Sequence, residues 1–144
     1  MKAFGEIVDG AMRLNDVGRM VIRWLYAVEQ RFANVVCDTV ICMPDHIHFV
    51  LIILEDEALV AAEMVAEANQ IVDRPQVNIN LGRIVGWFKT MTTNEYIRRV
   101  RANEWPSFRK RLWQRNYYER IVRDAEALRR IRQYIADNPR TWNP

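Results

Sequence analysis

The sequence contains little cysteine, proline, glycine or histidine. Among 144 residues there are two cysteines, five prolines, five glycines and two histidines. So few cysteines exclude a disulfide-rich secreted scaffold, and so few prolines and glycines exclude a collagen-like or low-complexity chain. The glycines also fit neither a dinucleotide-binding fingerprint nor a phosphate-binding loop. A Rossmann-type dinucleotide site and a P-loop are therefore excluded.

Long apolar runs are absent as well. The longest one, centred on residues 48–54, has the length of a strand and is far too short to span a membrane. The first residues lack the apolar region of a signal peptide. The odd spacing of Cys37 and Cys42 predicts that they lie on opposite faces of a strand, as two free thiols. We therefore expect a cytoplasmic protein with no membrane partner.

Charge is divided unevenly along the chain. The net charge is +3, but residues 1–82 hold 6 Lys and Arg against 12 Asp and Glu, whereas residues 83–144 hold 15 against 6. A basic half in one small domain predicts a polyanionic partner. The alternative is a solvated helix face. At this length we expect a single domain over residues 1–144.

The first half of the chain predicts one helix and two strands. Asn15 is a suitable N-cap, and apolar residues recur every three or four positions from there to about residue 33, which indicates an amphipathic helix. Two β-branched runs follow at residues 35–43 and 46–54, and the break between them predicts an antiparallel pair. Residues 46–54 are apolar on both faces, as in a central strand covered on both sides.

The second half predicts more helices and one more strand. We expect an alanine-rich helix at 58–70, a loop at 72–79, a long helix after Asn80, a strand at 112–122, and a last helix that Asp124 caps and Asn138-Pro139 ends. Gly82 and Gly86, four positions apart on the long helix, predict close packing. The order of elements indicates an α+β domain with an antiparallel sheet.

The two histidines are separated by a single residue. In a strand, His46 and His48 share a face a few ångströms apart, which suits two imidazoles that bind one metal ion. The alternative is a pair of half-buried polar residues where a strand begins. A zinc site that adds Cys37 and Cys42 is less well supported, because those thiols are expected on different faces.

The last helix offers a nucleophile and a third ligand. Tyr134 and Asn138 lie at positions i and i+4 and therefore on one helical face. Tyr134 is suited to attack a phosphodiester, and the amide oxygen of Asn138 to complete a metal shell. The alternative is a core aromatic followed by a helix C-cap. Tyr117 and Tyr118 are a rival source of a hydroxyl group.

Four segments, in this order along the chain, resemble one known family. They are MPDHIHF at 43–49, LGRIVGWFK at 81–89, WQRNYYERIVR at 113–123 and IRQYIADNP at 131–139. Together they are similar to the REP-associated tyrosine transposases, which belong to the single-tyrosine HUH (His-hydrophobic-His) transposases of single-stranded DNA insertion sequences. The similarity extends from about residue 4 to residue 142.

The resemblance implies a ferredoxin-like HUH domain, with helices packed on a central antiparallel sheet, and a metal-dependent DNA transposase. His46, His48 and Asn138 would hold a divalent ion, Mg²⁺ or Mn²⁺. Tyr134 would attack single-stranded or hairpin (REP-like) DNA, leaving a 5′-phosphotyrosine bond and a free 3′-hydroxyl. Reversal with another 3′-hydroxyl would rejoin strands without ATP, because the phosphoester energy is kept in the intermediate.

The resemblance also directs attention to basic and aromatic residues. The candidates for contacts to the DNA backbone are Lys89, Arg109, Lys110, Arg111, Arg115 and Arg123. Trp87, Trp105 and Trp113 could stack on unpaired bases, but core packing is favoured for most of them. We expect a monomer or homodimer that is associated with the nucleoid when it is bound to DNA.

Two departures from the family leave other functions open. The sequence starts just before the region that matches the family, so we expect the sheet to lack its usual first strand, and Asp45 stands where the family commonly has Asn. One alternative is a catalytically impaired, domesticated or truncated member that binds hairpin DNA without cleaving it. Another is a metal phosphodiesterase with a water nucleophile, in which Tyr134 is structural.

Overall fold

The computed structural model describes residues 3–54, 81–107, 111–113, 121–122 and 124–142. Its elements, in chain order, are β1 Gly5–Val8, β2 Ala11–Leu14, α1 Asp16–Arg31, β3 Val35–Cys42, β4 Ile47–Ile53, α3 Leu81–Arg101 and α4 Ala125–Thr141. Within these residues the strands form two antiparallel pairs, β1–β2 and β3–β4. The predicted α+β class is confirmed.

Helix α1 begins and packs as its sequence predicts. The side chain of Asn15 accepts a hydrogen bond of 2.8 Å from the backbone N–H of Gly18, which satisfies one of the unpaired donors of the first turn. The apolar stripe is buried, with Met20, Val21 and Val28 almost inaccessible to solvent. This stripe supplies much of the hydrophobic core.

Strands β3 and β4 pair antiparallel, as predicted, with one irregularity. Cys37 pairs with Leu51 and Thr39 pairs with Val50, so Asp38 is the extra residue of a β-bulge. The bulge shifts the alternation by one position and places Cys37 on the same face as Cys42. The prediction of opposite faces is therefore wrong, although both thiols are free.

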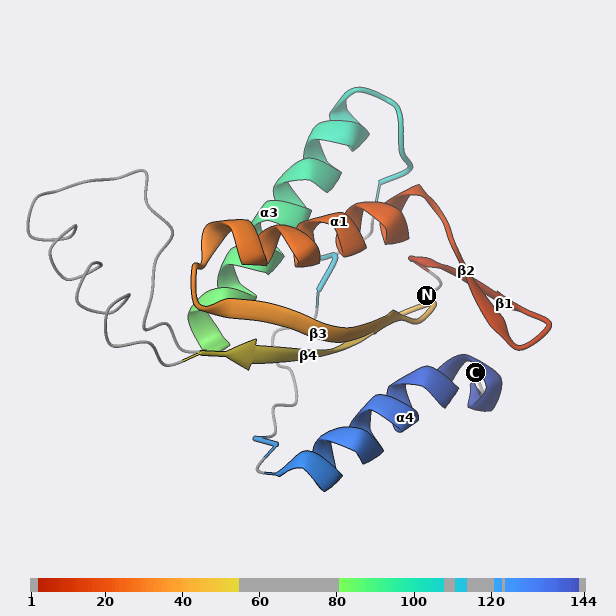
Figure 1. Ribbon diagram of the computed structural model, residues 1–144. Helices are drawn as coiled ribbons and strands as arrows, with labels where there is room; N and C mark the ends of the chain where they lie inside the picture. The colour runs from red at the N-terminus through yellow and green to blue at the C-terminus, as the bar shows by residue number, and fades with distance from the viewer. Residues whose placement is uncertain (1–2, 55–80, 108–110, 114–120, 123, 143–144) are drawn as a thin grey trace, which may run out of the picture.

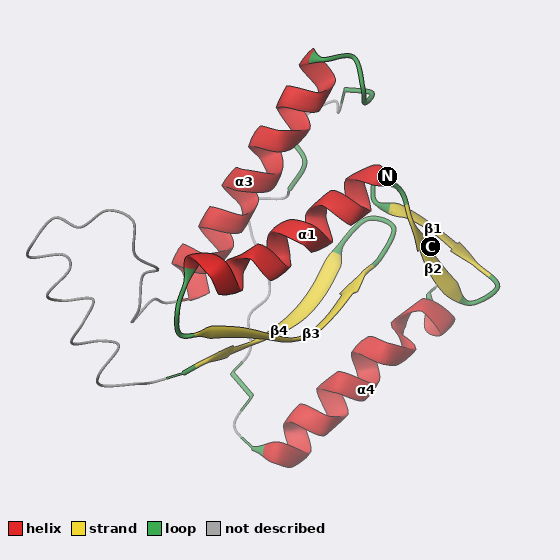
Figure 2. Cartoon of the chain, turned by 45° about the horizontal axis from the view of Figure 1, so that its top comes forward, coloured by secondary structure: helices red, strands yellow, loops and turns green. Residues whose placement is uncertain are grey.

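The β3–β4 pair separates two layers of helix. Helices α1 and α3 pack together on one face, and α4 lies across the other (Figures 1 and 2). The side chains of Val40, Phe49 and Leu51 face α1 and α3 and join the core. Within the described residues β4 pairs with β3 alone, so its predicted place as a central strand stays a prediction.

The sequence analysis did not predict the β1–β2 hairpin at the start of the chain. Its two-residue turn is Asp9-Gly10, and both residues have positive φ, 52° and 75°. These values match the type I′ turn that suits the twist of a hairpin. An Asp-Gly pair between two short alternating runs is the signal that identifies it.

Helix α3 carries aromatic residues into the core. Trp87 packs edge-on against Trp24 and Phe32, while Trp113, beyond the helix, contacts Phe4 and Phe88. Core packing of the tryptophans is thus confirmed. The predicted close packing at Gly86 is wrong, because a Cβ atom added there would meet nothing within 4 Å.

Helix α4 begins as predicted and ends later. Asp124 caps it by accepting from the N–H of Ala127, but the helix continues through Pro139 to Thr141. The prediction that Asn138-Pro139 ends it is wrong, because proline disrupts the turn before it and the residues after it can still be helical. The Thr141 hydroxyl donates back to the carbonyl of Asp137 and supports this last turn.

Several predictions concern residues outside the described ranges. They are the helix at 58–70, the loop at 72–79 and the middle of the strand at 112–122; the flanking residues 112–113 and 121–122 are described and are not in a strand. Over the described part of the chain, none of the helices has both the length and the apolar character needed to cross a bilayer.

Candidate functional site

His46 and His48 meet on the face of the β3–β4 pair that is turned toward α4. Their Nε2 atoms are 3.1 Å apart and their rings are nearly perpendicular. The i, i+2 spacing places both side chains on the same face, as the sequence predicts. The two Nε2 atoms are therefore within hydrogen-bond distance of each other beside the sheet.

The tight turn before β4 fixes the position of His46. The N–H of Met43 donates to the carbonyl of His46 at 2.7 Å, and the N–H of Phe4 donates to the carbonyl of Pro44 at 3.0 Å. Met43, Pro44 and Phe4 are buried. The turn is thus anchored in the core, and its outer residues, Asp45 and His46, are held where they reach the surface.

Asp45 orients the ring of His46. An oxygen of its carboxylate lies 2.6 Å from Nδ1 of His46. If Nδ1 carries the proton, the Nε2 atom presents a lone pair toward His48. A carboxylate that holds the far nitrogen of a histidine is the usual outer partner of a metal-binding imidazole.

His48 is held in its neutral form. Burial, and after it the charge of His46, lowers the pKa of His48 below its ordinary value. A neutral imidazole is the form that binds a metal ion. Trp142, just beyond α4, lies over His46 with ring centroids 5.6 Å apart and covers that side of the pair.

Helix α4 brings Tyr134 and Asn138 to the histidines' face of the sheet. The ring of Tyr134 packs edge-on against His48 with centroids 5.9 Å apart, and its side chain is 61% exposed. Asn138 is buried, and in the described part of the chain its amide nitrogen bonds to the carbonyl of Tyr134, at 3.3 Å, rather than to a histidine. Tyr134 is therefore both close to the pair and accessible to a large substrate.

The two imidazoles are close enough to hold one divalent ion between them. Their Nε2 atoms lie at hydrogen-bond distance from each other, 3.1 Å. His46 and His48 would supply the two nitrogens, and the amide oxygen of Asn138 is the third ligand that the family resemblance predicts. No group of three or more His, Cys, Asp or Glu within the described ranges forms a metal site.

Asp38 and Arg132 form a contact beside the candidate site. The sequence did not predict this contact. Arg132, on α4, donates from Nε to one oxygen of Asp38 at 2.8 Å and from a terminal nitrogen to the other. The two residues are 94 positions apart. Arg129, Arg130 and Arg132 lie close together in the sequence of this helix, which is a weak signal for such a pair. The bulge that places Asp38 has no clear sequence signature.

The two described residues among the predicted DNA contacts do not lie together beside the histidines. Lys89 is half-buried on α3, which packs on the face of the sheet opposite α4, and Arg111 is exposed. The others, together with the rival Tyr117 and Tyr118, lie outside the described residues: Arg109, Lys110, Arg115 and Arg123. Their roles stay predictions.

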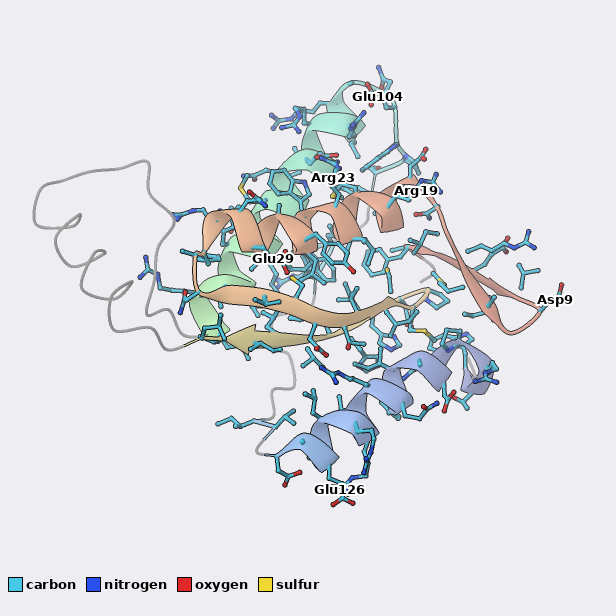
Figure 3. The ribbon with its side chains drawn as sticks, viewed as in Figure 1. Asp9, Arg19, Arg23, Glu29, Glu104 and Glu126 are labelled. Carbon is cyan, nitrogen blue, oxygen red and sulfur yellow. The ribbon has the colours of Figure 1, made fainter. Side chains whose placement is uncertain are left out.

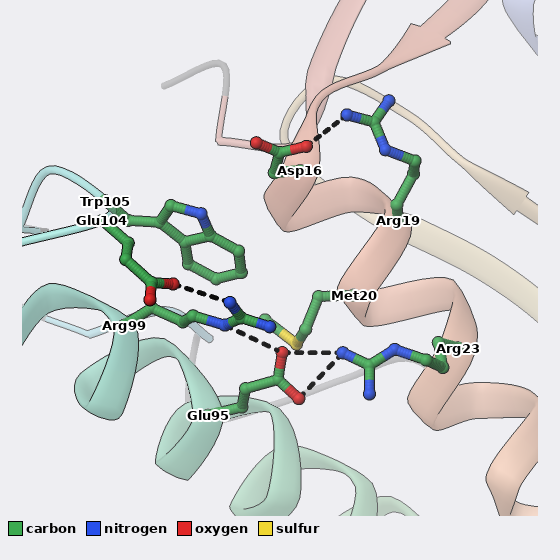
Figure 4. A pocket seen from close by; sticks show the side chains of 8 residues that line it. All are labelled: Asp16, Arg19, Met20, Arg23, Glu95, Arg99, Glu104 and Trp105. Atoms are coloured by element: carbon green, nitrogen blue, oxygen red, sulfur yellow. Dashed lines mark hydrogen bonds and ion pairs between the residues drawn. The ribbon is translucent and has the colours of Figure 1, made fainter. Parts of the chain in front are cut away.

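An open pocket lies between α1 and α3, away from the histidines. It has a volume of about 520 Å³ and is lined by Asp16, Arg19, Met20, Arg23, Glu95, Arg99, Glu104 and Trp105 (Figure 4). Its arginines are engaged by these acids: Arg23 bonds both oxygens of Glu95, and Arg99 bonds Glu104. The pocket is thus a set of ion pairs that ties the two helices together on the far side of the sheet from the histidines.

Comparisons with known proteins give one informative relative. No protein-family profile matches the chain, and no solved structure matches it. A protein of Haemophilus influenzae that carries the name "Uncharacterized protein" is 30% identical over 140 residues, which cover 96% of this chain and 73% of that protein. The chain therefore belongs to the same family as this Haemophilus influenzae protein.

Proposed function

We propose that the protein is a metal-dependent DNA transposase that cleaves and rejoins single-stranded or hairpin DNA through a 5′-phosphotyrosine intermediate. The observation that carries the proposal is the convergence of the His46 and His48 Nε2 atoms at 3.1 Å, with the Tyr134 ring packed against His48. Two histidines able to hold a metal ion, with an exposed tyrosine beside them, are the minimum needed for this chemistry.

The residues of the chain divide the work as follows. His46, His48 and Asn138 bind Mg²⁺ or Mn²⁺, which when bound polarises the scissile phosphate. The Tyr134 hydroxyl gives up its proton to solvent and attacks the phosphorus, so that a Tyr Oη–P bond forms while the bond from phosphorus to the 3′ oxygen breaks. The departing oxygen takes up a proton and becomes a free 3′-hydroxyl, and the reverse step joins the phosphate to another strand.

The proposed fold is a ferredoxin-like HUH domain. Its support is the α+β architecture, the antiparallel strand pair that carries the histidines, and the tyrosine helix packed on the same face. The basic second half of the chain is consistent with a nucleic-acid substrate.

The proposal is tested with a labelled single-stranded hairpin DNA and Mn²⁺. We expect a protein–DNA adduct that survives denaturation and is absent from Tyr134→Phe, which keeps the ring packing and removes the hydroxyl. Hairpin binding without cleavage by the wild type would identify a DNA-binding protein instead. Cleavage that persists in Tyr134→Phe would identify a phosphodiesterase with a water nucleophile.

The role of the histidines is tested separately. His46→Ala removes one of the two converging nitrogen atoms, so we expect cleavage to be lost while binding of the hairpin persists, since phosphate contacts come from other residues. A gel-shift titration measures binding on the same samples. Unchanged cleavage in this variant would refute the metal site.

A further inference from the structure

Helix α4 is held to the sheet by few apolar contacts. Of its apolar side chains only Ile135 is buried, and Leu128 and Ile131 are half-buried beside it. Apolar contact is non-directional, so a narrow stripe fixes the distance of a helix from a sheet better than its rotation about its own axis. A directional contact would fix that rotation more closely than these apolar contacts do.

The bidentate contact between Asp38 and Arg132 is directional. Two parallel hydrogen bonds between a guanidinium and a carboxylate fix both distance and angle. The Asp38 side chain is only 10% exposed, and the Thr39 hydroxyl also donates to it at 2.6 Å. These hydrogen bonds, that of Arg132 first, hold the pKa of Asp38 below its ordinary value, so the carboxylate is charged at neutral pH.

Arg132 and Tyr134 lie on opposite sides of the apolar stripe of α4 that is centred on Ile135. At 100° per residue, Arg132 lies about 60° to one side of Ile135 and Tyr134 about 100° to the other. A roll of about 10° would move an atom that is about 8 Å from the helix axis by about 1.4 Å. A displacement of that size at a reacting group costs about 100-fold in rate.

We propose that Asp38 and Arg132 form a clamp that sets the rotation of α4 and thereby positions the Tyr134 hydroxyl at the histidine pair. The bulge of β3 is what aims Asp38 at the helix, and bulges often serve this purpose near active sites. The clamp's consequence for the reaction rests on the proposed function, whereas its effect on α4 does not. Both residues are positioning residues.

The experiment measures hairpin binding and the rate of adduct formation at saturating hairpin with Mn²⁺. Asp38→Asn keeps the shape of the side chain and removes its charge, and we expect the rate to fall about 100-fold while hairpin affinity is unchanged or tighter. Arg132→Lys keeps the positive charge but loses the planar guanidinium that donates two parallel hydrogen bonds. This variant should also react more slowly than the wild type. A rate effect without loss of affinity is not expected of a residue that only stabilises the fold.

A matched control removes an ion pair from the same helix. Glu126 pairs with Arg130 at 3.0 Å and lies on the side of α4 away from the sheet (Figure 3). Glu126→Gln should leave the rate within about two-fold of the wild type, because this pair does not bridge helix and strand.

Hydrogen exchange of the backbone amides tests the clamp without any reaction. We expect the amides of residues 128–138 to exchange about 10-fold faster in Asp38→Asn, with those of α1 unchanged. If the wild type forms no adduct but this change is seen, the proposed function fails and the clamp stands. If exchange in α4 is unchanged, or if Asp38→Asn reacts at the wild-type rate or faster, the clamp is refuted and Arg132 is better explained as a DNA contact.

Discussion

At the scale of single residues, the orientation of the histidine pair depends on Asp45, which is not itself a proposed metal ligand. Asp45 holds Nδ1 of His46 at 2.6 Å, which directs Nε2 toward His48. Without that contact the imidazole ring of His46, on an exposed turn, would rotate more freely. The orientation of one ring therefore determines whether two nitrogen atoms converge.

The first prediction concerns Asp45. Asp45→Ala should weaken Mn²⁺ binding by about 10- to 100-fold, because it removes the outer partner of His46. Asp45→Asn should lower the Mn²⁺ affinity much less, since the amide oxygen of Asn still accepts a hydrogen bond from Nδ1 of His46. Titration calorimetry with Mn²⁺ measures both. Equal affinity in Asp45→Ala and the wild type would show that the contact does not orient the ring.

Glu95 is the buried charge on which the α1–α3 contact depends. Its side chain is 3% exposed and accepts hydrogen bonds from Arg23 and from the indole of Trp24. Burial by itself would raise the pKa of Glu95, but the hydrogen bonds from Arg23 and Trp24 and the charges of Arg23 and Arg99 outweigh it and lower the pKa below 4.5. The carboxylate is therefore more stable as an anion in the folded protein.

The second prediction follows from the sign of that shift. A lowered folded-state pKa stabilises the fold fully above about pH 4.5 and progressively less as pH falls through the folded value. At pH 7, Glu95→Gln should lower the free energy of unfolding by about 2 kcal/mol, and the difference from the wild type should shrink toward pH 3. Urea denaturation at the two pH values measures this.

A control for Glu95 is available in the same pocket. Glu104 pairs with Arg99 at the surface, and its side chain is 49% exposed. Glu104→Gln should change the free energy of unfolding far less than Glu95→Gln. Equal effects of the two substitutions, or a difference for Glu95→Gln that does not depend on pH, would contradict the account of Glu95.

At the scale of elements, close backbone contacts fix how the first helix meets the N-terminal segment. A Cβ atom on Gly18, in the first turns of α1, would lie 2.3 Å from the carbonyl oxygen of Phe4. The same segment bonds to the turn before His46 through the N–H of Phe4. The position of α1 is thus linked through backbone atoms to the turn that carries the site.

The third prediction compares two helical glycines. Gly18→Ala should destabilise the protein by about 2 kcal/mol, because backbone atoms must move to admit the methyl group. Gly86→Ala, with nothing within 4 Å of the added atom, should stabilise it by about 0.5–1 kcal/mol through helix propensity. Thermal or urea unfolding of both variants measures the difference. A stabilised Gly18→Ala would contradict the close contact.

At the scale of the whole molecule, the β3–β4 pair separates the hydrophobic core from the proposed active site. The large core lies between the sheet and helices α1 and α3, whereas α4 covers the other face with one buried apolar residue and carries Tyr134. This arrangement allows the tyrosine helix to be adjusted by a few polar contacts without disturbing the core. A substrate can reach the exposed Tyr134 side chain from solvent.

Much of this arrangement could be predicted from periodicity and caps. The helix after Asn15, the antiparallel strands and the shared face of His46 and His48 all follow from local spacing. The β-bulge at Asp38 could not be predicted, because it depends on how two strands register, and it reversed the face assigned to Cys37. The contact between Asp38 and Arg132 was missed for a related reason, since it joins residues 94 positions apart.

The central claim is that Tyr134 is the nucleophile beside the histidine pair, and one measurement tests it most directly. The wild-type protein is incubated with single-stranded hairpin DNA and Mn²⁺, digested, and its peptides are analysed by mass spectrometry. We predict a nucleotide joined through its 5′-phosphate to the peptide that contains Tyr134, and a free 3′-hydroxyl on the released DNA. DNA cleaved with no adduct, or an adduct on Tyr117 or Tyr118, would contradict the account.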